Sequence, residues 1–413
     1  MHAGYGHRIL KISTAALLAI VVLVFILRVA VPSAQQLSHG YLSYYVAAQT
    51  LRSGEPGSRL YDDRSFAEHA MQLSHGTITD IYLANPPTVA VAWLPLSYLS
   101  VREARKVWIA TSVACLGISI WLIATQLTLP GTPWLLTAMC AVFMLGAPTR
   151  EQIHTGQMYA LVLLLHVIGW RAYTRQRHLT TGLALALAMV LKISGWPIGL
   201  LMIGRRRWSA LCWAGATAAA AGLLTLPWVG VEAWKTFLLE AVPLTLHRGA
   251  ASLTAYQDTT GFWQHLFRYD AALNPHPLTN APDIATLLTI ITIAGACYAL
   301  LKSRCAAGNA FAAAVALTEL ASPVAEQYHY VVLLLPLAVL GQTAWARRSM
   351  TWGAVVLVAT FLMIGPIDYK SAHPNWDVLE NYPRLIGGWI LFVALLIPQR
   401  AEPSSRLPVP PWG

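Results

Sequence analysis

Long stretches without a charged side chain recur along the whole sequence, and they constrain the fold more than any other feature. Residues 81–101 form one such stretch, and residues 107–149 form another with a Leu-Pro-Gly-Thr-Pro turn at 129–133. About 20 apolar residues are enough for a helix to cross a bilayer, so the first stretch has room for one span and the second for two. Further stretches lie at 12–27, 152–170, 208–231, 284–301, 305–318, 327–346, 349–367 and 385–399, and one at 179–204 is interrupted by Lys192.

These stretches predict an all-α polytopic membrane protein. They lack the alternation of apolar and polar residues that membrane β-strands show, and a helix satisfies its own backbone hydrogen bonds within the bilayer. Only 11% of the residues are charged, against about 25% in soluble domains. We therefore expect one membrane domain over residues 1–400, with about 11–13 transmembrane helices.

The positive charges predict the orientation of the chain. Basic residues lie in short gaps between apolar stretches, as they do in cytoplasmic loops. These gaps contain Arg102, Arg105 and Lys106; Arg205–Arg207; Lys302 and Arg304; and Arg347–Arg348. If the N-terminus is also cytoplasmic, three longer polar segments face outward: residues 32–80, 232–283 and 368–384. The proline-rich tail 401–413 is then a disordered cytoplasmic segment, and we expect a multi-pass protein of the plasma membrane.

Two segments leave alternatives open. The basic residues at 171–178 resemble a cytoplasmic loop, although a simple count of spans places them outside. A half-length or re-entrant helix within 150–204 would resolve this conflict. The apolar run at 12–27 follows basic residues and could be a signal peptide, but the many later spans favour a first helix that is retained.

Charge placement and cysteine spacing argue against several functions. The net charge of +10 is not gathered on one basic face with stacking aromatics, so we expect no nucleic-acid partner. The five cysteines show neither a CxxC motif nor the Cys/His spacing of a zinc site. No Asp-x-Asp pair occurs in the predicted outward segments, and we expect neither a metal nor another cofactor.

The first outward segment is too patterned for a plain connector. Its acidic residues are Glu55, Asp62, Asp63, Glu68 and Asp80. Long structured loops often carry function, and a carboxylate in such a loop can act as a general base for a hydroxyl group. Each of these residues could equally be a solvated loop charge or a helix cap.

Lys192 is the most unusual residue within the apolar stretches. A charged side chain at the centre of a spanning helix costs about 2.5–3.5 kcal/mol, so it should face a cavity or a partner. An anionic lipid phosphate would be a suitable partner. The alternatives are an internal ion pair with Glu319 or Glu151, and a lysine that only marks the end of a helix.

Several short motifs follow one another in an order that resembles glycosyltransferase family 87, from about residue 37 to residue 340. Each motif is weak alone, but their order and spacing are fairly specific. The motifs are Tyr44-Tyr45-Val46-Ala47-Ala48, Leu60-Tyr61-Asp62, Asn85-Pro86-Pro87, Gly156-Gln157, Lys192, Tyr256-Gln257-Asp258, and Ser322-Pro323 with His329.

The resemblance implies a bundle of the GT-C class that transfers a sugar, usually mannose, from a polyprenyl-phosphate donor. The acceptor would be a glycolipid or glycan, and transfer would occur with inversion on the extracytoplasmic face. Lys192 and His329 would bind the donor phosphate. The residues expected to contact the substrates are Tyr44, Tyr45, Asn85, Gln157 and Gln257.

One departure from the family pattern affects the catalytic base. Many members carry an aspartate where this chain has Gly40, just before the aromatic residue that precedes the tyrosine pair. Glycine cannot accept a proton. We predict that Asp62, Asp63 or His39, in this order of preference, replaces it. The late motif also departs, because Glu326-Gln327-Tyr328 precedes His329.

Two other functions stay open from sequence. A secondary transporter or lipid flippase would use Lys192 and Glu319 as an ion relay, although no internal repeat supports this. A catalytically silent binding protein could have kept the fold, and Gly40 is the best argument for it.

Overall fold

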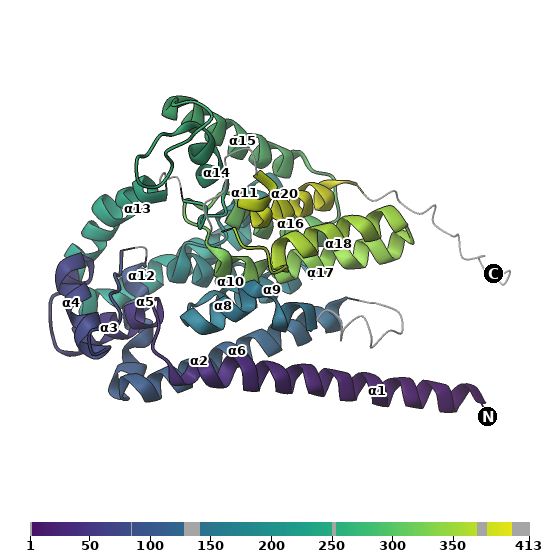
Figure 1. The fold of residues 1–413 in the computed structure, drawn as a ribbon, viewed down its shortest axis with the longest axis horizontal. Coiled ribbons are helices and arrows are strands. Elements are labelled where there is room, and N and C mark those ends of the chain that lie inside the picture. Colours follow the sequence, from purple (N-terminus) through teal and green to yellow (C-terminus); the bar gives the residue numbers. More distant parts are fainter. Residues whose placement is uncertain (1, 84, 128–140, 250–252, 370–377, 399–413) are drawn as a thin grey trace.

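The protein is an all-helical bundle in a computed structural model that describes residues 2–83, 85–127, 141–249, 253–369 and 378–398 (Figure 1). No β-strand occurs among these residues. Five helical segments are long and apolar enough to cross a membrane: Ile12–Gln35, Val101–Gln126, Trp208–His247, Pro282–Lys302 and Gln327–Arg347. Five shorter apolar helices accompany them. The prediction of an all-α polytopic membrane protein is confirmed, while residues 128–140 of a predicted span lie outside the described residues.

The N-terminal part begins with a long helix at the edge of the bundle. It comprises α1 (His2–Phe25), η1 (Ile26–Ala30) and α2 (Val31–Gln35), which run on without a break. Figure 1 shows this helix along the lower edge, beside α6 (Val101–Gln126). The side chains of α1 that are described from residue 12 onward are mostly exposed, as expected for a helix that faces lipid.

The segment after α2 folds into a compact helical layer, which we call the first-loop layer. It contains α3 (Tyr41–Arg52), η2 (Gly57–Tyr61), α4 (Asp63–Leu73), α5 (Pro87–Trp93) and η3 (Leu94–Tyr98). The core of this layer is aromatic: the Trp93 ring lies 5.7 Å from that of Tyr41 and 4.5 Å from that of Trp108. The layer forms the left end of the molecule in Figure 1.

Residues 81–101 belong to this layer, so the predicted span there is wrong. Pro86 and Pro87 start a helix of only seven residues, as expected from proline at the first helical position. Pro95 then lies in the short 3-10 helix η3. Prolines remove backbone donors, and the next long helix starts only where Ser100 and Glu103 form a capping box.

Residues 147–204 form four consecutive short helices. These are α8 (Ala147–Thr155), α9 (Tyr159–Thr174), α10 (His178–Lys192) and α11 (Trp196–Gly204). Gly156 ends α8 in the left-handed conformation, and Ile193 with Gly195 separates α10 from α11 in the same way. The expected half-length helices are therefore present, since α8 and α11 have nine residues each.

The next helix runs further than the apolar stretch predicted. α12 (Trp208–Thr236) continues through η4 (Phe237–Ala241) into α13 (Val242–Gly249). Gly230, at φ 72° and ψ 170°, is not helical and forms a kink between two helical parts of this segment. The predicted outward segment 232–283 therefore starts as helix, and it carries α12 alongside the first-loop layer.

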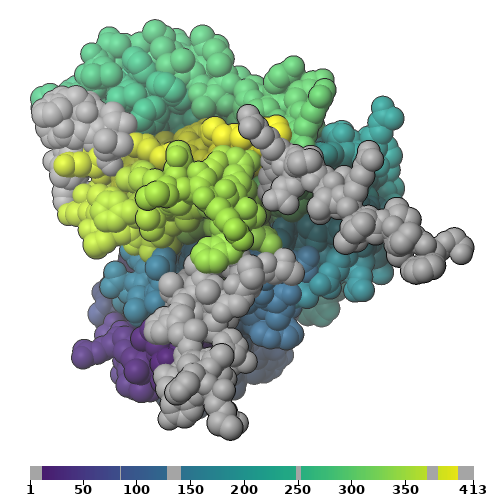
Figure 2. Space-filling model, turned by 90° about the vertical axis from the view of Figure 1, so that its right-hand side faces the viewer, coloured from purple at the N-terminus to yellow at the C-terminus, as the bar shows by residue number. Residues whose placement is uncertain are grey.

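The C-terminal half completes the bundle around a buried alanine-rich helix, α16 (Ala307–Leu320). Before it come α14 (Thr259–Phe267) and α15 (Pro282–Lys302). After it come η5 (Gln327–Leu333), α17 (Leu334–Arg347), α18 (Met350–Ile364), α19 (Val378–Asn381) and α20 (Pro383–Leu396). In the end-on view of Figure 2, the yellow-green C-terminal segments lie between blue and green ones.

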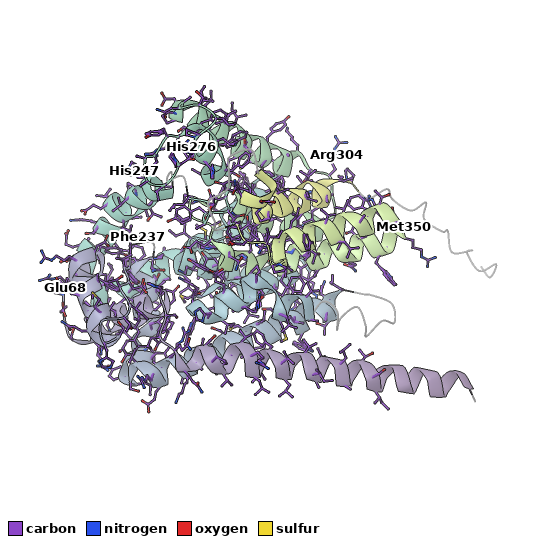
Figure 3. The ribbon with its side chains drawn as sticks, viewed as in Figure 1. Glu68, Phe237, His247, His276, Arg304 and Met350 are labelled. Atoms are coloured by element: carbon purple, nitrogen blue, oxygen red, sulfur yellow. The ribbon has the colours of Figure 1, made fainter. Side chains whose placement is uncertain are left out.

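Two of the basic gaps lie at the opposite end of the bundle from the first-loop layer, whereas the gap with Arg102, Arg105 and Lys106 starts α6 beside that layer and does not fit the predicted orientation. Figure 3 shows Arg304, and Met350 after the Arg347–Arg348 gap, toward the right end, whereas Glu68 of the first-loop layer lies at the far left. This separation agrees with the charge pattern of a protein that crosses a membrane.

Arg105 ties three separate elements together at the base of the first-loop layer. Its side chain on α6 is 1% exposed. Its Nε donates to the Ser33 carbonyl at 3.0 Å, and one Nη donates to the His154 carbonyl at 2.6 Å. The guanidinium also lies 4.9 Å from the centre of the Tyr41 ring. The C-terminal carbonyls of α8 thus receive a buried cation, which is favourable at a helix C-terminus.

We expect Arg105→Met to destabilise the fold. The substitution keeps much of the apolar volume but leaves buried carbonyls without donors, which should lower the free energy of unfolding by about 3 kcal/mol. Thermal unfolding in detergent should show a melting temperature lower by several degrees. Lys106→Met is the matched control, because Lys106 is the exposed neighbour on the same helix. An equal effect of both variants would contradict the anchoring role of Arg105.

Candidate active site

A cavity of about 830 Å³ lies between the first-loop layer and the bundle. This volume falls within the usual range of small-molecule sites. Phe237, one of its lining residues, is on the same side of the molecule as Glu68 in Figure 3. The lining includes the polar residues His39, Ser43, Asp80, Asn85, Glu151, Gln157, Lys192, Glu319, Glu326, Tyr328 and His329.

Lys192 enters this cavity at the end of α10. The helix stops there because Ile193 takes up a left-handed conformation at φ 52°. The Lys192 Nζ donates to Asn85 Oδ1 at 2.8 Å and to Gln157 Oε1 at 3.1 Å. None of the ion pairs formed within the described part of the chain includes Lys192, so the alternative of a pair with Glu319 or Glu151 is not realised there.

The two amides that bind Lys192 are themselves held in place. Asn85 Nδ2 donates to Ser43 Oγ at 3.2 Å, which directs Asn85 Oδ1 toward the lysine. Gln157 follows the left-handed Gly156, and its Oε1 also accepts a hydrogen bond from the Tyr44 hydroxyl. The structure therefore brings together four residues predicted from sequence: Tyr44, Asn85, Gln157 and Lys192.

His329 lies on another wall of the cavity, on η5, and is 5% exposed. Its Nδ1 accepts a hydrogen bond from the Glu326 backbone N–H at 3.0 Å. In the neutral ring the proton must then be on Nε2, which makes Nε2 a donor. The Tyr159 ring lies 4.2 Å from the His329 ring and 5.5 Å from Lys192 Nζ, so one aromatic residue contacts both predicted phosphate ligands.

Asp80 lines the cavity, although it is not among the catalytic bases predicted from sequence. Its Oδ2 accepts hydrogen bonds from the backbone N–H groups of Gly40, at 2.6 Å, and Ser43, at 3.0 Å. Its Oδ1 accepts from the Ile81 N–H at 3.0 Å. A carboxylate from 40 residues downstream thus caps the N-terminus of α3, where the helix dipole favours negative charge.

Burial raises the pKa of the Asp80 carboxyl above its ordinary value, while its hydrogen bonds from the Gly40, Ile81 and Ser43 N–H groups act in the opposite direction. The sequence feature that could have identified Asp80 is the apolar sequence next to it. Asp80 directly precedes the apolar residues Ile81–Leu83, whereas Asp62 and Asp63 stand between arginines. An acidic residue in an apolar setting is a better candidate for a buried role.

Other predicted site residues lie elsewhere. Asp62 caps α4 through the Ser65 N–H, forms an ion pair with Arg59 at 3.2 Å and is 43% exposed. Neither Asp62 nor Asp63 lines the cavity, whereas His39 does. A catalytic role for Asp62 or Asp63 stays a prediction that their positions do not support.

Tyr45 and Gln257 are also absent from the cavity lining. The Tyr45 hydroxyl donates to the Leu99 carbonyl at 2.8 Å. Gln257 is fully buried, and its Nε2 donates to the carbonyls of Thr254 and Asn381. Both side chains connect backbone segments, and their predicted contact with substrate stays untested.

The bundle side of the cavity also carries carboxyl groups, in addition to Asp80 from the first-loop layer. Glu319 on α16 is 2% exposed, and its Oε1 has no hydrogen-bond partner. The Tyr328 hydroxyl donates to Glu326 Oε1 at 3.3 Å. No group of three or more His, Cys, Asp or Glu residues suited to a metal occurs in the described ranges; that the protein needs no metal stays a prediction.

We expect Gly40→Ala to destabilise the protein more than Gly54→Ala. Both glycines have left-handed φ angles, 75° and 78°, which cost a residue with a Cβ about 1–2 kcal/mol. An added Cβ at Gly40 would also clash with the Gln157 amide, whereas one at Gly54 meets nothing within 4 Å. Thermal unfolding of both variants separates these effects, and equal losses would show that position 40 has room for a side chain.

Comparison with known proteins places these features in a family. The model of glycosyltransferase family 87 matches residues 82–323. A polyprenol-phosphate-mannose-dependent alpha-(1-2)-phosphatidylinositol mannoside mannosyltransferase of Mycolicibacterium smegmatis is 26% identical over 385 residues, covering 87% of this chain and 84% of that protein. No solved structure matches. Asn85, Gln157 and Lys192 lie within the matched region, and the chain belongs to glycosyltransferase family 87 as a membrane-embedded glycosyltransferase.

Proposed function

We propose that this protein transfers mannose from a polyprenyl-phosphate donor to a glycolipid, with inversion, on the extracytoplasmic face of the plasma membrane. The printed name of the Mycolicibacterium smegmatis relative supports mannose as the sugar and a phosphatidylinositol mannoside as the acceptor class. The sequence prediction of cytoplasmic basic gaps supports the face, because the cavity lies toward the end with the first-loop layer.

The observation that carries this proposal is the environment of Lys192. Its ammonium group faces the cavity and is held by two neutral amide oxygens. The cavity carboxylates Asp80 and Glu326 act on this buried cation without pairing with it directly, and the phosphodiester of a polyprenyl-phosphate sugar would supply a direct counter-charge. The Nε2–H of His329 can donate to the same phosphate, since Tyr159 contacts both side chains.

The chemistry is a single displacement at the anomeric carbon of the sugar. An acceptor hydroxyl attacks this carbon and loses its proton to a carboxylate base. The bond between the carbon and the phosphate oxygen breaks, and polyprenyl phosphate leaves with one additional negative charge. Lys192 and His329 would stabilise this charge as it develops, which is where fixed donors contribute most to catalysis.

The lipid part of the donor has an apolar exit from the cavity. Ile193, Trp196 and Leu246 line the cavity and are 41%, 36% and 56% exposed. Exposed apolar side chains on a membrane protein suit contact with lipid. A polyprenyl chain can therefore extend into the bilayer between α11 and α13 while its phosphate stays beside Lys192.

We expect Lys192→Met to abolish most transfer. With purified protein in lipid, radiolabelled polyprenyl-phosphate-mannose and phosphatidylinositol mannoside, kcat/KM should fall on the order of 10²-fold, and donor affinity should also weaken. Lys235→Met is the control, because Lys235 is exposed and pairs with Glu232 outside the cavity. Full activity of Lys192→Met would contradict phosphate binding by Lys192. Transport of a lipid-linked sugar without any transfer would favour a flippase.

Two substitutions of His329 distinguish the roles of its ring nitrogens. Asparagine can replace Nδ1 as the acceptor of the Glu326 N–H, whereas glutamine can replace Nε2 as a donor toward the cavity. If Nε2 binds the donor phosphate, His329→Gln should be at least roughly tenfold more active than His329→Asn. This factor corresponds to the contribution of one hydrogen bond to a charged group. The same transfer assay measures both variants. Higher activity of the asparagine variant would place the essential contact at Nδ1.

A further inference from the structure

Position 40 cannot hold the base in this chain. Gly40 has a φ angle of 75°, a conformation that side chains with a Cβ rarely adopt. A Cβ there would also clash with the side-chain amide of Gln157. Gln157 cannot easily yield, because its Oε1 is bound by both Tyr44 and Lys192. A carboxylate at position 40 would therefore displace the residue that orients Lys192.

The Asp80 carboxylate lies directly beside this position. Its Oδ2 is 2.6 Å from the Gly40 nitrogen, and both residues line the cavity. A negative charge thus stands next to the backbone of residue 40, although it comes from another part of the first-loop layer. Gly40 lacks a side chain, and its backbone N–H donates a hydrogen bond to the Asp80 carboxylate. The glycine and the aspartate together therefore place a carboxylate beside position 40.

From this arrangement we propose that Asp80 is the general base that removes the proton from the acceptor hydroxyl. The assignment rests on the proposed function. A carboxylate has about four lone-pair sites, and the Gly40, Ser43 and Ile81 N–H groups use three of them. The remaining site can accept the acceptor hydroxyl. In the step, the O–H proton moves to Asp80, the acceptor oxygen bonds to the anomeric carbon, and polyprenyl phosphate leaves.

Two properties suit Asp80 to this role. Three backbone hydrogen bonds fix the carboxylate before substrate arrives, so little ordering is needed during the reaction. Burial raises its pKa above the ordinary value, and a more basic carboxylate accepts a proton more readily at neutral pH.

The other carboxylates of the cavity are less suitable. Glu326 lies three residues from His329 on the wall assigned to the leaving phosphate and already accepts from Tyr328. Glu319 comes from α16 in the bundle core. An inverting base must act on the face of the sugar opposite the leaving group. Asp80 belongs to the first-loop layer, whereas His329 lies on η5.

The test compares Asp80→Asn with wild type in the same transfer assay, together with donor affinity and melting temperature. Asparagine still offers an oxygen to the Gly40 N–H but cannot take up the proton. We expect kcat to fall on the order of 10²–10⁴-fold, with donor affinity and melting temperature close to wild type. Asp80→Ser, which also retains a capping oxygen, should behave in the same way and serves if the asparagine variant does not fold.

Asp270→Asn is the matched control. Asp270 also accepts two backbone N–H groups, of Ala272 and Leu273, but it is only partly buried and lies outside the cavity. Its kcat should equal that of wild type. Asp62→Asn and Asp63→Asn, assayed in parallel, test the first bases predicted from sequence.

Each contrary result has a distinct meaning. If wild type transfers mannose and Asp80→Asn does too, the assignment of Asp80 is wrong and the proposed function stands. If Asp80→Asn loses donor binding or stability together with turnover, Asp80 is a positioning residue and not the base. If wild type transfers no sugar from any polyprenyl-phosphate donor, the proposed function itself is wrong.

Discussion

The arrangement of the site depends on the ammonium of Lys192, which is held by neutral amides and forms no direct ion pair among the described residues. Its hydrogen bonds to Asn85 and Gln157 join three parts of the chain: the segment before α5, the junction of α8 and α9, and the end of α10. Neutral amides orient this ammonium, and the cavity carboxylates Asp80 and Glu326 act on its charge from a greater distance. An anionic lipid substrate would add a direct partner for the ammonium within the cavity.

Breaks in the helices place these groups, and small residues make the breaks possible. Gly156 ends α8 in a left-handed conformation, and a Cβ there would clash with Arg105. Arg105 in turn binds the last carbonyls of α8, so the cation that fixes the helix end also requires the glycine. Gln157 follows immediately and can point into the cavity. Half-length helices that end at a site are a common way to bring polar groups to membrane depth.

Much of this site could be predicted from sequence because its signals are local. Lys192 is a lone charge in an apolar stretch, and His329 and Gln157 belong to short ordered motifs. The structure places Lys192, Gln157 and His329 around one cavity.

The prediction of a membrane span at 81–101 was wrong because apolar composition alone does not distinguish a membrane helix from a buried loop layer. Its prolines at 86, 87 and 95 were the stronger signal. Asp80 was missed since its role depends on contacts across 40 residues that no local pattern encodes.

The pair formed by Gly40 and Asp80 shows how a lost side chain can be compensated within one cavity. Because the carboxylate is at position 80 and glycine is at position 40, the Gln157 side chain has room beside residue 40. Asp80 also gives the N-terminus of α3 an anionic cap that Gly40 itself cannot provide. The same carboxylate then serves the helix and faces the substrate. Its capping bonds hold it in position, and its remaining lone pair is left for chemistry, so stability and catalysis at this point of the fold do not compete for the same interaction.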